Sequence, residues 1–307
     1  MLDSLLFAAP GTFFPAAAAG LYGLLFGSFL NVVIHRLPRM MQREADDYLA
    51  AESESREEAA KLGSVITSLS YQSSVPLPRT DRYDLVLPRS ACPACGHKIT
   101  AMENIPVFSY LFLRGKCSGC GVPISMRYPL IELLTGLLSA YMVWHFGSGI
   151  LGLAALAFTY LLIAMTFIDA DTQFLPDSLT YPLLWGGLLV NLQGLIVPLH
   201  EAVIGAVAGY LSLWLVNQAF RLVRKMDGMG NGDFKLLAAL GAWMGWKMLP
   251  MIILFSALVG SVVGIAMIAL SRHGRGKPMP FGPYLAGAGM IALLFGNAIL
   301  QAYLGSV

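Results

Sequence analysis

Long apolar stretches separated by short polar segments make up most of the chain. A bilayer core about 30 Å thick is crossed by about 20 apolar residues in a helix. Seven stretches are long enough to cross it, and an eighth, residues 234–246, is apolar but short. We expect a re-entrant or shortened span at this eighth stretch. The overall pattern indicates an all-α polytopic membrane protein with about eight transmembrane helices. Seven clear spans are predicted, at residues 13–34, 128–146, 150–168, 178–197, 201–220, 248–270 and 283–304.

A polar region, residues 35–127, interrupts this pattern between the first and second predicted helices. It divides the chain into a first transmembrane helix (1–34), the polar region itself and a membrane core (128–307). Residues 43–61 are rich in acidic side chains and predict a solvated helix, inside an insertion at about 41–75. That helix is either a surface insertion or an acidic docking face for a partner.

Composition supports the membrane assignment. Hydrophobic residues make up 56% of the chain and charged residues 12%, whereas soluble domains carry roughly 25% charged residues. The net charge of +2 is too small to argue for a nucleic-acid partner, and we expect none. The N-terminus lacks the positively charged region of a cleavable signal peptide, so we expect the first apolar segment to be retained.

Basic residues in the connecting segments predict the orientation, because cytoplasmic loops are enriched in Lys and Arg. Loops 146–149 and 198–201 carry no Lys or Arg, and Lys247 is a single exception on their side of the membrane. We therefore expect the polar region to be cytoplasmic and both termini to be periplasmic. The basic residues of loops 221–235 and 271–282 are Arg221, Arg224, Lys225, Lys235, Arg272, Arg275 and Lys277.

All four cysteines lie in the polar region, as a CPAC pair and a CSGC pair separated by 21 residues. Two such pairs can supply four thiolates to one tetrahedral zinc ion. We expect one structural zinc held by Cys92, Cys95, Cys117 and Cys120. Two disulfides are the alternative, but a cytoplasmic location disfavours them. His97 is either a substitute ligand or a surface histidine. A catalytic zinc is not expected, because four thiolates leave no open position.

Carboxylates gather where two predicted spans meet the cytoplasmic border. The segment FIDADTQFLPD (167–177) ends one span, and GMGNGDFK (228–235) precedes another. A carboxylate in a membrane helix costs about 2.5–3.5 kcal/mol, so its presence suggests a function. Two acids sharing one proton can hydrolyse a peptide bond, one taking a proton from water and the other polarising the carbonyl. Gly230 and Gly232 would allow close backbone approach.

Each carboxylate also has a structural interpretation. Asp171 and Asp177 can lie in headgroup water, and Asp177 after Pro176 is a plausible helix N-cap. Asp233 can cap the helix that follows it. A second function class, a transporter whose acids bind a cation or proton, is disfavoured. The acids lie at one membrane edge rather than at the midplane, and no paired halves repeat. No HExxH zinc-protease motif is present.

Six segments together resemble the type 4 prepilin peptidase family, also called leader peptidase/N-methyltransferase. The resemblance covers nearly the whole chain, and the acidic insertion is its main departure. The segments are FGSFLNVVIHRLP (26–38), ENIPVFSYLFLRGKC (103–117), ISMRYPLIELLTG (124–136), FIDADTQFLPDSLT (167–180), GMGNGDFKLLAALGAWMGW (228–246) and PFGPYLAGAG (280–289).

The resemblance implies that Asp169 and Asp233 are the catalytic pair. It implies cleavage of a short basic leader from type IV prepilins and type II secretion pseudopilins, after a glycine and on the cytoplasmic side. It also implies methylation of the new N-terminus with S-adenosylmethionine as methyl donor, with Gly115 and Lys116 as the matching positions. The chain would then be a multi-pass protein of the bacterial inner membrane, in contact with lipid and with its prepilin substrates.

Four residues in these segments keep a second interpretation. Gly115 is equally a turn residue, and Lys116 equally a contact to phospholipid or solvent. His35 and Arg36, at the end of the first predicted span, anchor that span by the positive-inside rule. Alternatively, they contact the substrate or the cysteine region.

Overall fold

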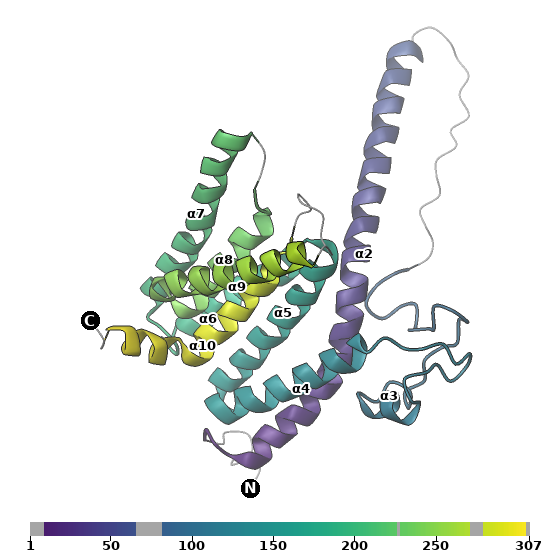
Figure 1. Cartoon of the computed structure of the whole chain (residues 1–307). Coiled ribbons are helices and arrows are strands. Elements are labelled where there is room, and N and C mark those ends of the chain that lie inside the picture. Colours follow the sequence, from purple (N-terminus) through teal and green to yellow (C-terminus); the bar gives the residue numbers. More distant parts are fainter. Residues whose placement is uncertain (1–8, 66–81, 226–227, 271–278, 305–307) are drawn as a thin grey trace.

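The computed structural model describes residues 9–65, 82–225, 228–270 and 279–304, and the regular elements in these residues are helices, with two isolated β-bridges in the region between α2 and α4. Figure 1 shows the helices arranged as one bundle, from which one long helix projects. This confirms the predicted all-α class. The elements are α2 (Phe13–Val65), α3 (Phe108–Phe112), α4 (Arg127–Phe146), α5 (Ile150–Thr172), α6 (Asp177–Asn191), α7 (Leu199–Arg224), α8 (Asn231–Met244), the 3₁₀ turn η1 (Trp246–Met248), α9 (Leu249–Ala269) and α10 (Gly282–Leu304).

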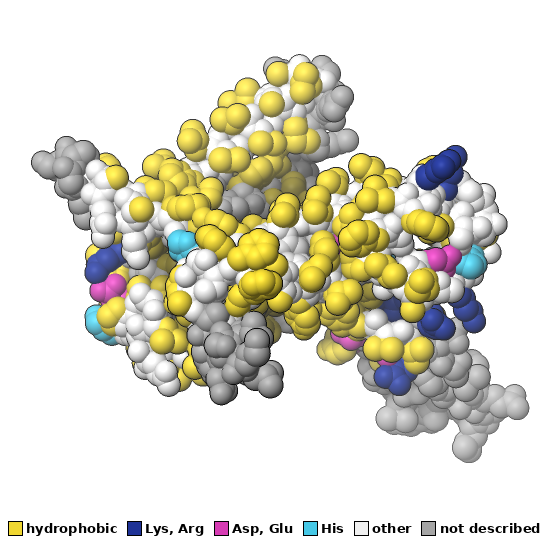
Figure 2. Space-filling model, turned by 90° about the horizontal axis from the view of Figure 1, so that it is seen from below, with side chains coloured by type: hydrophobic (Ala, Val, Ile, Leu, Met, Phe, Trp, Pro, Cys, Tyr) yellow, Lys and Arg dark blue, Asp and Glu magenta, His cyan; other side chains and the backbone are white. Residues whose placement is uncertain are grey.

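Six helical segments of the described chain are long and apolar enough to cross a membrane, and they contain α2, α4, α5, α7, α9 and α10. Large apolar side chains remain exposed on them, as expected for surfaces that contact lipid. Figure 2 shows apolar side chains spread over one face of the molecule, with charged side chains toward its edges. The multi-pass membrane architecture predicted from the sequence is therefore confirmed.

Two helices of the bundle are shorter than a full span. Helix α8 has 14 residues and α6 has 15, which corresponds to about 21 and 22 Å at 1.5 Å per residue. The short α8 agrees with the shortened span predicted at 234–246. The full span predicted at 178–197 is wrong, because the helix in this segment, α6, ends at Asn191.

The side chain of Asn191 explains why α6 ends there. Its Nδ2 donates to the carbonyl oxygens of Ala242 and Trp243 at 2.9 Å each, near the end of α8. Its Oδ1 accepts hydrogen bonds from the backbone N–H groups of Ile196 and Val197. One buried amide thus satisfies backbone groups at the end of α8 and in the turn that leads to α7.

Helix α2 continues far beyond the first predicted span. The sequence predicts a helix end near residue 34, but α2 runs through Pro38 to Val65 without interruption. The acidic segment 43–61 is helical as predicted, and it forms the outer part of α2 that projects from the bundle in Figure 1. Proline lacks an N–H group and normally breaks a helix. Helix α2 does not break at Pro38, so the polar region starts as a continuation of the first membrane helix.

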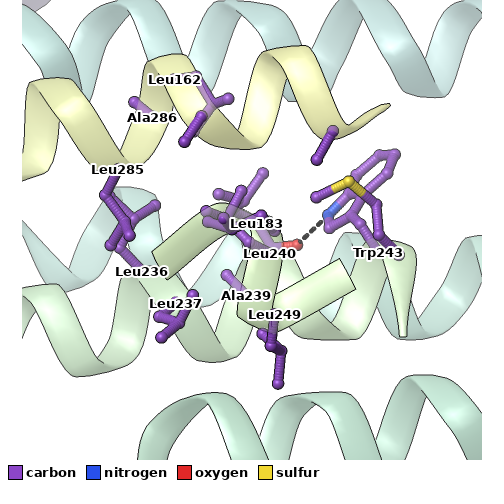
Figure 3. Close-up of a cluster of buried hydrophobic side chains, with 14 of the residues drawn as sticks. Leu162, Leu183, Leu236, Leu237, Ala239, Leu240, Trp243, Leu249, Leu285 and Ala286 are labelled. Carbon is purple, nitrogen blue, oxygen red and sulfur yellow. Dashed lines mark hydrogen bonds between the residues drawn. The ribbon is translucent and has the colours of Figure 1, made fainter. Parts of the chain in front are cut away.

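Helix α8 forms the centre of the larger apolar core. Nearly all its side chains are buried, among them Phe234, Leu237 and Leu240, and Figure 3 shows several of them between residues of the surrounding helices. The indole N–H of Trp243 donates to the carbonyl oxygen of Leu183 on α6 at 2.7 Å. A second core joins α2, α4 and α5. Because α8 is enclosed, the residues at its start are held by several helices at once.

Glycines allow α7 to approach α8 closely. A Cβ atom on Gly205 would overlap the backbone carbonyl of Gly241, and a Cβ atom on Gly241 would overlap that of Gly205. The backbones of α7 and α8 are therefore in direct contact at this point, as small residues permit in membrane helix pairs.

We predict that Gly205→Ala lowers the unfolding temperature of the purified protein in detergent. The added methyl group forces α7 away from α8, and such overpacking costs about 1–3 kcal/mol. This exceeds the gain of about 1 kcal/mol that alanine brings over glycine in a helix. The matched control is Gly287→Ala in α10, where a Cβ atom meets no atom within 4 Å. Equal unfolding temperatures for the two variants would contradict the close approach.

Candidate active site

The structure places Asp169 and Asp233 at the same end of the bundle. Asp169 lies in the last turn of α5 and Asp233 in the first turn of α8. Their side chains are buried, with 4% and 7% of the surface of each residue exposed. The charges of the two carboxyl groups interact with each other. Two acids that lie 64 positions apart in the sequence (233 − 169) are thus neighbours in one apolar environment.

A third helix contributes to this site through Gly282, the first residue of α10. Its backbone N–H donates to Asp169 Oδ2 at 2.9 Å. A Cβ atom at this position would lie 2.7 Å from the same carboxylate oxygen. Gly282 belongs to the PFGP segment, and the sequence predicts no role for it. The only signal was a glycine at the start of a predicted span, which does not show where its N–H group points.

Backbone packing fixes the start of α8. Gly230 is the N-cap residue, so Asp233 does not hold that position and lies in the first turn instead. A Cβ atom on Gly232 would lie 2.7 Å from Leu175 Cβ, so the glycine allows α8 to contact the LPD segment closely. The close backbone approach expected at Gly232 is therefore present, although its partner is Leu175 of this chain.

The loop before α8 is held by Asn217 of α7. The buried Asn217 Oδ1 accepts hydrogen bonds from the backbone N–H groups of Gly228 at 2.9 Å and Met229 at 3.2 Å. A Cβ atom on Gly228 would lie 2.7 Å from the ring of Phe220. The loop that leads to Asp233 is thus positioned by α7, through a role of Asn217 that no pattern in the sequence predicts.

An ion pair lies two residues beyond each of the two buried acids. Arg127 of α4 donates to both oxygens of Asp171, at 2.7 and 2.6 Å. Lys235 of α8 donates to both oxygens of Asp177, at 2.6 and 2.8 Å. Side chains two positions apart on a helix point in nearly opposite directions, because each residue turns by about 100°. The acid therefore faces the interior while its neighbour ties the same turn to another helix.

These ion pairs revise two structural interpretations made from sequence. Asp177 is the first residue of α6, and the N-cap position belongs to Pro176. Asp171 is partly exposed, but Arg127 binds it in a bidentate geometry that orients both groups.

Arg36 connects α2 to the region that contains the cysteines. Its guanidinium donates to the carbonyl oxygens of Asp84 at 2.9 Å and Pro88 at 2.6 Å, and the residue is buried. Of the two roles considered for this position, anchoring or contact with the cysteine region, the structure shows the contact. The Nε2 atom of His35 lies 2.7 Å from a guanidinium nitrogen of Arg39 on the same helix.

The four cysteines form a cluster in which all sulfur atoms lie within 4.8 Å of one another. The Sγ atoms of Cys92 and Cys120 are 3.9 Å apart, and those of Cys95 and Cys117 are 4.0 Å apart. A tetrahedral ion with sulfur ligands at about 2.3 Å requires sulfur–sulfur distances of about 3.8 Å. All four thiols are free in the structure. The cluster therefore fits a single metal ion, and the geometry does not favour disulfides.

Glu103 joins the two cysteine pairs through neighbouring side chains. His97 Nε2 lies 3.1 Å from its carboxylate, and the hydroxyl of Ser118 donates to it. Thr100 donates to the same carboxylate through its N–H and its hydroxyl. The hydrogen bonds from Ser118 and Thr100 lower the pKa of Glu103 to about 2. His97 Nε2 is thus engaged by Glu103, and the four thiols form the group that could hold a metal ion.

Gly115 and Lys116 lie just before the second cysteine pair. The Gly115 N–H donates to the Tyr110 carbonyl at 2.8 Å, and its own carbonyl accepts from Ile124 N–H at 2.7 Å. Its φ of 68° and the nearby Tyr110 hydroxyl both disfavour a side chain. The Gly115 backbone is therefore used inside the fold, as expected of a turn residue. Lys116 is exposed.

Two family models match the chain. Residues 21–146 match the model described as the bacterial peptidase A24 N-terminal domain, and residues 156–265 match the type IV leader peptidase family. No solved structure matches the chain.

Three similar proteins all carry the name prepilin leader peptidase/N-methyltransferase. That of Aeromonas salmonicida (strain A449) is 54% identical, over 94% of this chain and 93% of the relative. That of Pseudomonas aeruginosa is 53% identical, over 92% and 91%. That of Burkholderia pseudomallei (strain 1026b) is 48% identical, over 95% and 89%.

Proposed function

Because this chain belongs to the type IV leader peptidase family, we propose that it removes the leader peptides of type IV prepilins and of type II secretion pseudopilins. Cleavage follows a glycine on the cytoplasmic side of the inner membrane. The enzyme then methylates the new N-terminal residue with S-adenosylmethionine. The observation that carries the proposal is the pair of buried carboxyl groups, Asp169 and Asp233, at one end of the bundle.

The two acids hydrolyse the peptide bond by activating water. The ionised carboxylate removes a proton from water, whose oxygen bonds to the scissile carbonyl carbon. The protonated acid donates its proton to the carbonyl oxygen, which gives a tetrahedral intermediate. The C–N bond then breaks as the acid that took a proton from water gives it to the leaving nitrogen, and a hydroxyl proton of the intermediate returns to the other acid. We assign the ionised role to Asp169, because the Gly282 N–H donates to it. Asp233, which has no such donor among the described backbone contacts, takes the acid role.

The two ion pairs act as positioning contacts for these acids. Arg127–Asp171 fixes the last turn of α5 against α4, and Lys235–Asp177 fixes the first turn of α8 against α6. Each pair lies on the polar side of a turn whose other side carries the buried acid. In this arrangement, neither helix can rotate without breaking a bidentate contact.

The cysteine cluster binds one structural zinc ion in the cytoplasmic region. Zinc suits four thiolates in tetrahedral geometry, and the sulfur spacing fits its bond length. Bound zinc would hold the two pairs together, as Glu103 does from outside the cluster. The ion has no part in peptide hydrolysis, because the four ligands leave no site for water.

For the methyl donor, the family resemblance points to Gly115 and Lys116. The hydrogen bonds of the Gly115 backbone are made within the fold, so Gly115 would shape the turn at which the methyl donor binds. The exposed Lys116 side chain is the group at this position that can reach the carboxylate of the methyl donor. The donor itself supplies the methyl group, and the protein orients the new N-terminal amine.

We predict that Asp169→Asn and Asp233→Asn each reduce leader cleavage of a purified prepilin by at least about 10²-fold, the usual effect of losing a general acid or base. Both asparagines keep the size of the side chain, so the variants should insert and unfold like the wild type. Mass spectrometry of the pilin N-terminus measures cleavage and methylation together.

A precleaved pilin provides the control for this experiment. Both variants should methylate it at the wild-type rate, because methyl transfer does not use the acid pair. If either variant cleaves the prepilin normally, the paired-acid mechanism is wrong.

We predict that Gly282→Ala slows cleavage by about 10²-fold, since the added Cβ would lie 2.7 Å from Asp169 Oδ2 and a displacement of about 1 Å has this effect on rate. Gly287→Ala, on the same helix but without neighbouring atoms, should cleave at the wild-type rate. Equal rates for the two variants would show that Gly282 does not constrain Asp169.

We predict one zinc ion per purified chain, measured by elemental analysis, and its loss in the variant that combines Cys92→Ser with Cys95→Ser. Two remaining thiolates cannot complete the tetrahedral shell. Peptide cleavage should fall less than methylation, since Asp169 and Asp233 belong to other elements. Wild-type zinc content in the double variant would refute the site.

A further inference from the structure

Helix α3 presents an apolar face that the bundle does not cover. The exposed fractions are 64% for Phe108, 65% for Leu111 and 91% for Phe112. On the other side of this short helix, Tyr110 lies against Gly115, and its hydroxyl donates to the Ile124 carbonyl at 3.4 Å. The three large side chains therefore point away from the cysteine region. An exposed apolar cluster of this kind marks contact with a membrane or with another protein.

Two hydrogen bonds determine where α3 lies along the membrane helices. The N–H of Val107, the residue before α3, donates to Glu132 Oε2 of α4 at 2.8 Å. The hydroxyl of Ser28 on α2 donates to Asn104 Oδ1 at 3.3 Å. Glu132 is five residues after the start of α4 at Arg127, a distance of about 8 Å along the helix axis. The segment that carries α3 is therefore attached inside the span of α4.

The contact between α2 and α4 places the start of α3 at the same depth along the membrane helices. A Cβ atom on Gly27 would lie 2.7 Å from Glu132 Cα, so Ser28 and Glu132 are at one height. Ser28 precedes Arg36 by eight residues on α2, or about 12 Å. Arg36 and the Arg127–Asp171 ion pair mark the polar border of the bundle. The start of α3 thus lies about 8–12 Å on the membrane side of this border.

The exposed face of α3 continues a surface that already faces lipid. At the level of Glu132 and beyond it, α4 exposes Leu130, Leu133, Leu134 and Leu137. Figure 1 shows α3 beside α2 and α4, away from the projecting outer part of α2. Two exposed basic residues, Arg114 and Lys116, follow α3 directly. Apolar side chains flanked by basic residues are typical of segments that lie in the interface of an anionic membrane.

We propose that α3 is a membrane anchor, in which Phe108, Leu111 and Phe112 insert into the leaflet on the side of the acid pair. Arg114, the exposed basic residue that follows α3, lies at the level of the phosphates and contacts anionic headgroups. The occupant of this face is lipid, because its level matches the lipid-facing surface of α4. The anchor holds the cysteine region against the membrane, independently of the peptidase and methyltransferase activities. It also accounts for the carboxylate at Glu132, whose partner is the N–H of Val107.

The test is photocrosslinking in vesicles of phosphatidylethanolamine and phosphatidylglycerol. The full-length protein carries p-benzoylphenylalanine at position 112, or at position 111 in a second variant, and adducts are identified by mass spectrometry. We expect lipid adducts at both positions, as abundant as at Leu137, which lies on the exposed surface of α4.

Tyr48 provides the matched control, as an aromatic residue that is 71% exposed on the outer part of α2. Position 48 should give no lipid adduct above background. The proposal is overturned if positions 111 and 112 behave like position 48. It is also overturned if they crosslink to a second copy of the chain or to a pilin in place of lipid.

A second measurement tests the role of Arg114. In vesicles with equal amounts of phosphatidylglycerol and the neutral phosphatidylcholine, adducts at position 112 should favour the anionic lipid. Arg114→Gln should remove that preference without removing the adducts. Equal labelling of both lipids by the chain with Arg114 intact would overturn the electrostatic part of the proposal.

Discussion

Two carboxyl groups buried at the same end of an apolar helix bundle are the constraint on which the other features of this molecule depend. Each acid would cost free energy in a membrane helix, and together they repel when both are ionised. The structure holds them at one end, with the N–H of Gly282 aimed at Asp169. Helix α8, which carries Asp233, is enclosed by core residues along nearly its whole length. Small residues make this enclosure possible, because backbone contacts such as Gly205–Gly241 bring α7 directly onto α8.

Charged residues elsewhere in the chain connect parts of the molecule rather than reacting. Arg127 and Lys235 tie the turns that carry the acids to neighbouring helices. Arg36 and Glu132 tie the cysteine region to α2 and α4 through backbone groups. The cysteine region is therefore attached to the same helices that support the acid pair, and its proposed anchor α3 lies against the same membrane.

Much of this could be predicted from sequence, because apolar length and paired motifs are local signals. The spans of α4, α5, α7, α9 and α10 and the cysteine cluster are of this kind. Other features depend on contacts between distant segments. The helix predicted at 178–197 ends early because Asn191 bonds to α8. Helix α2 passes through Pro38, although proline favours a helix end in the sequence. The roles of Gly282, Asn217 and the two ion pairs could not be predicted, since no local pattern shows which N–H or charge meets which partner.

The central claim, that Asp169 and Asp233 meet in the membrane-embedded protein, is tested most directly by crosslinking. Both positions are changed to cysteine in one chain, and a protease site is inserted into the turn between α6 and α7. Native membranes are then treated with a short bifunctional thiol reagent. If the two side chains meet, the fragments produced by the protease stay joined until the crosslink is reduced. Fragments that separate with every short reagent would contradict the account, provided that a control pair at positions 177 and 235, an ion pair across the same protease site, stays joined.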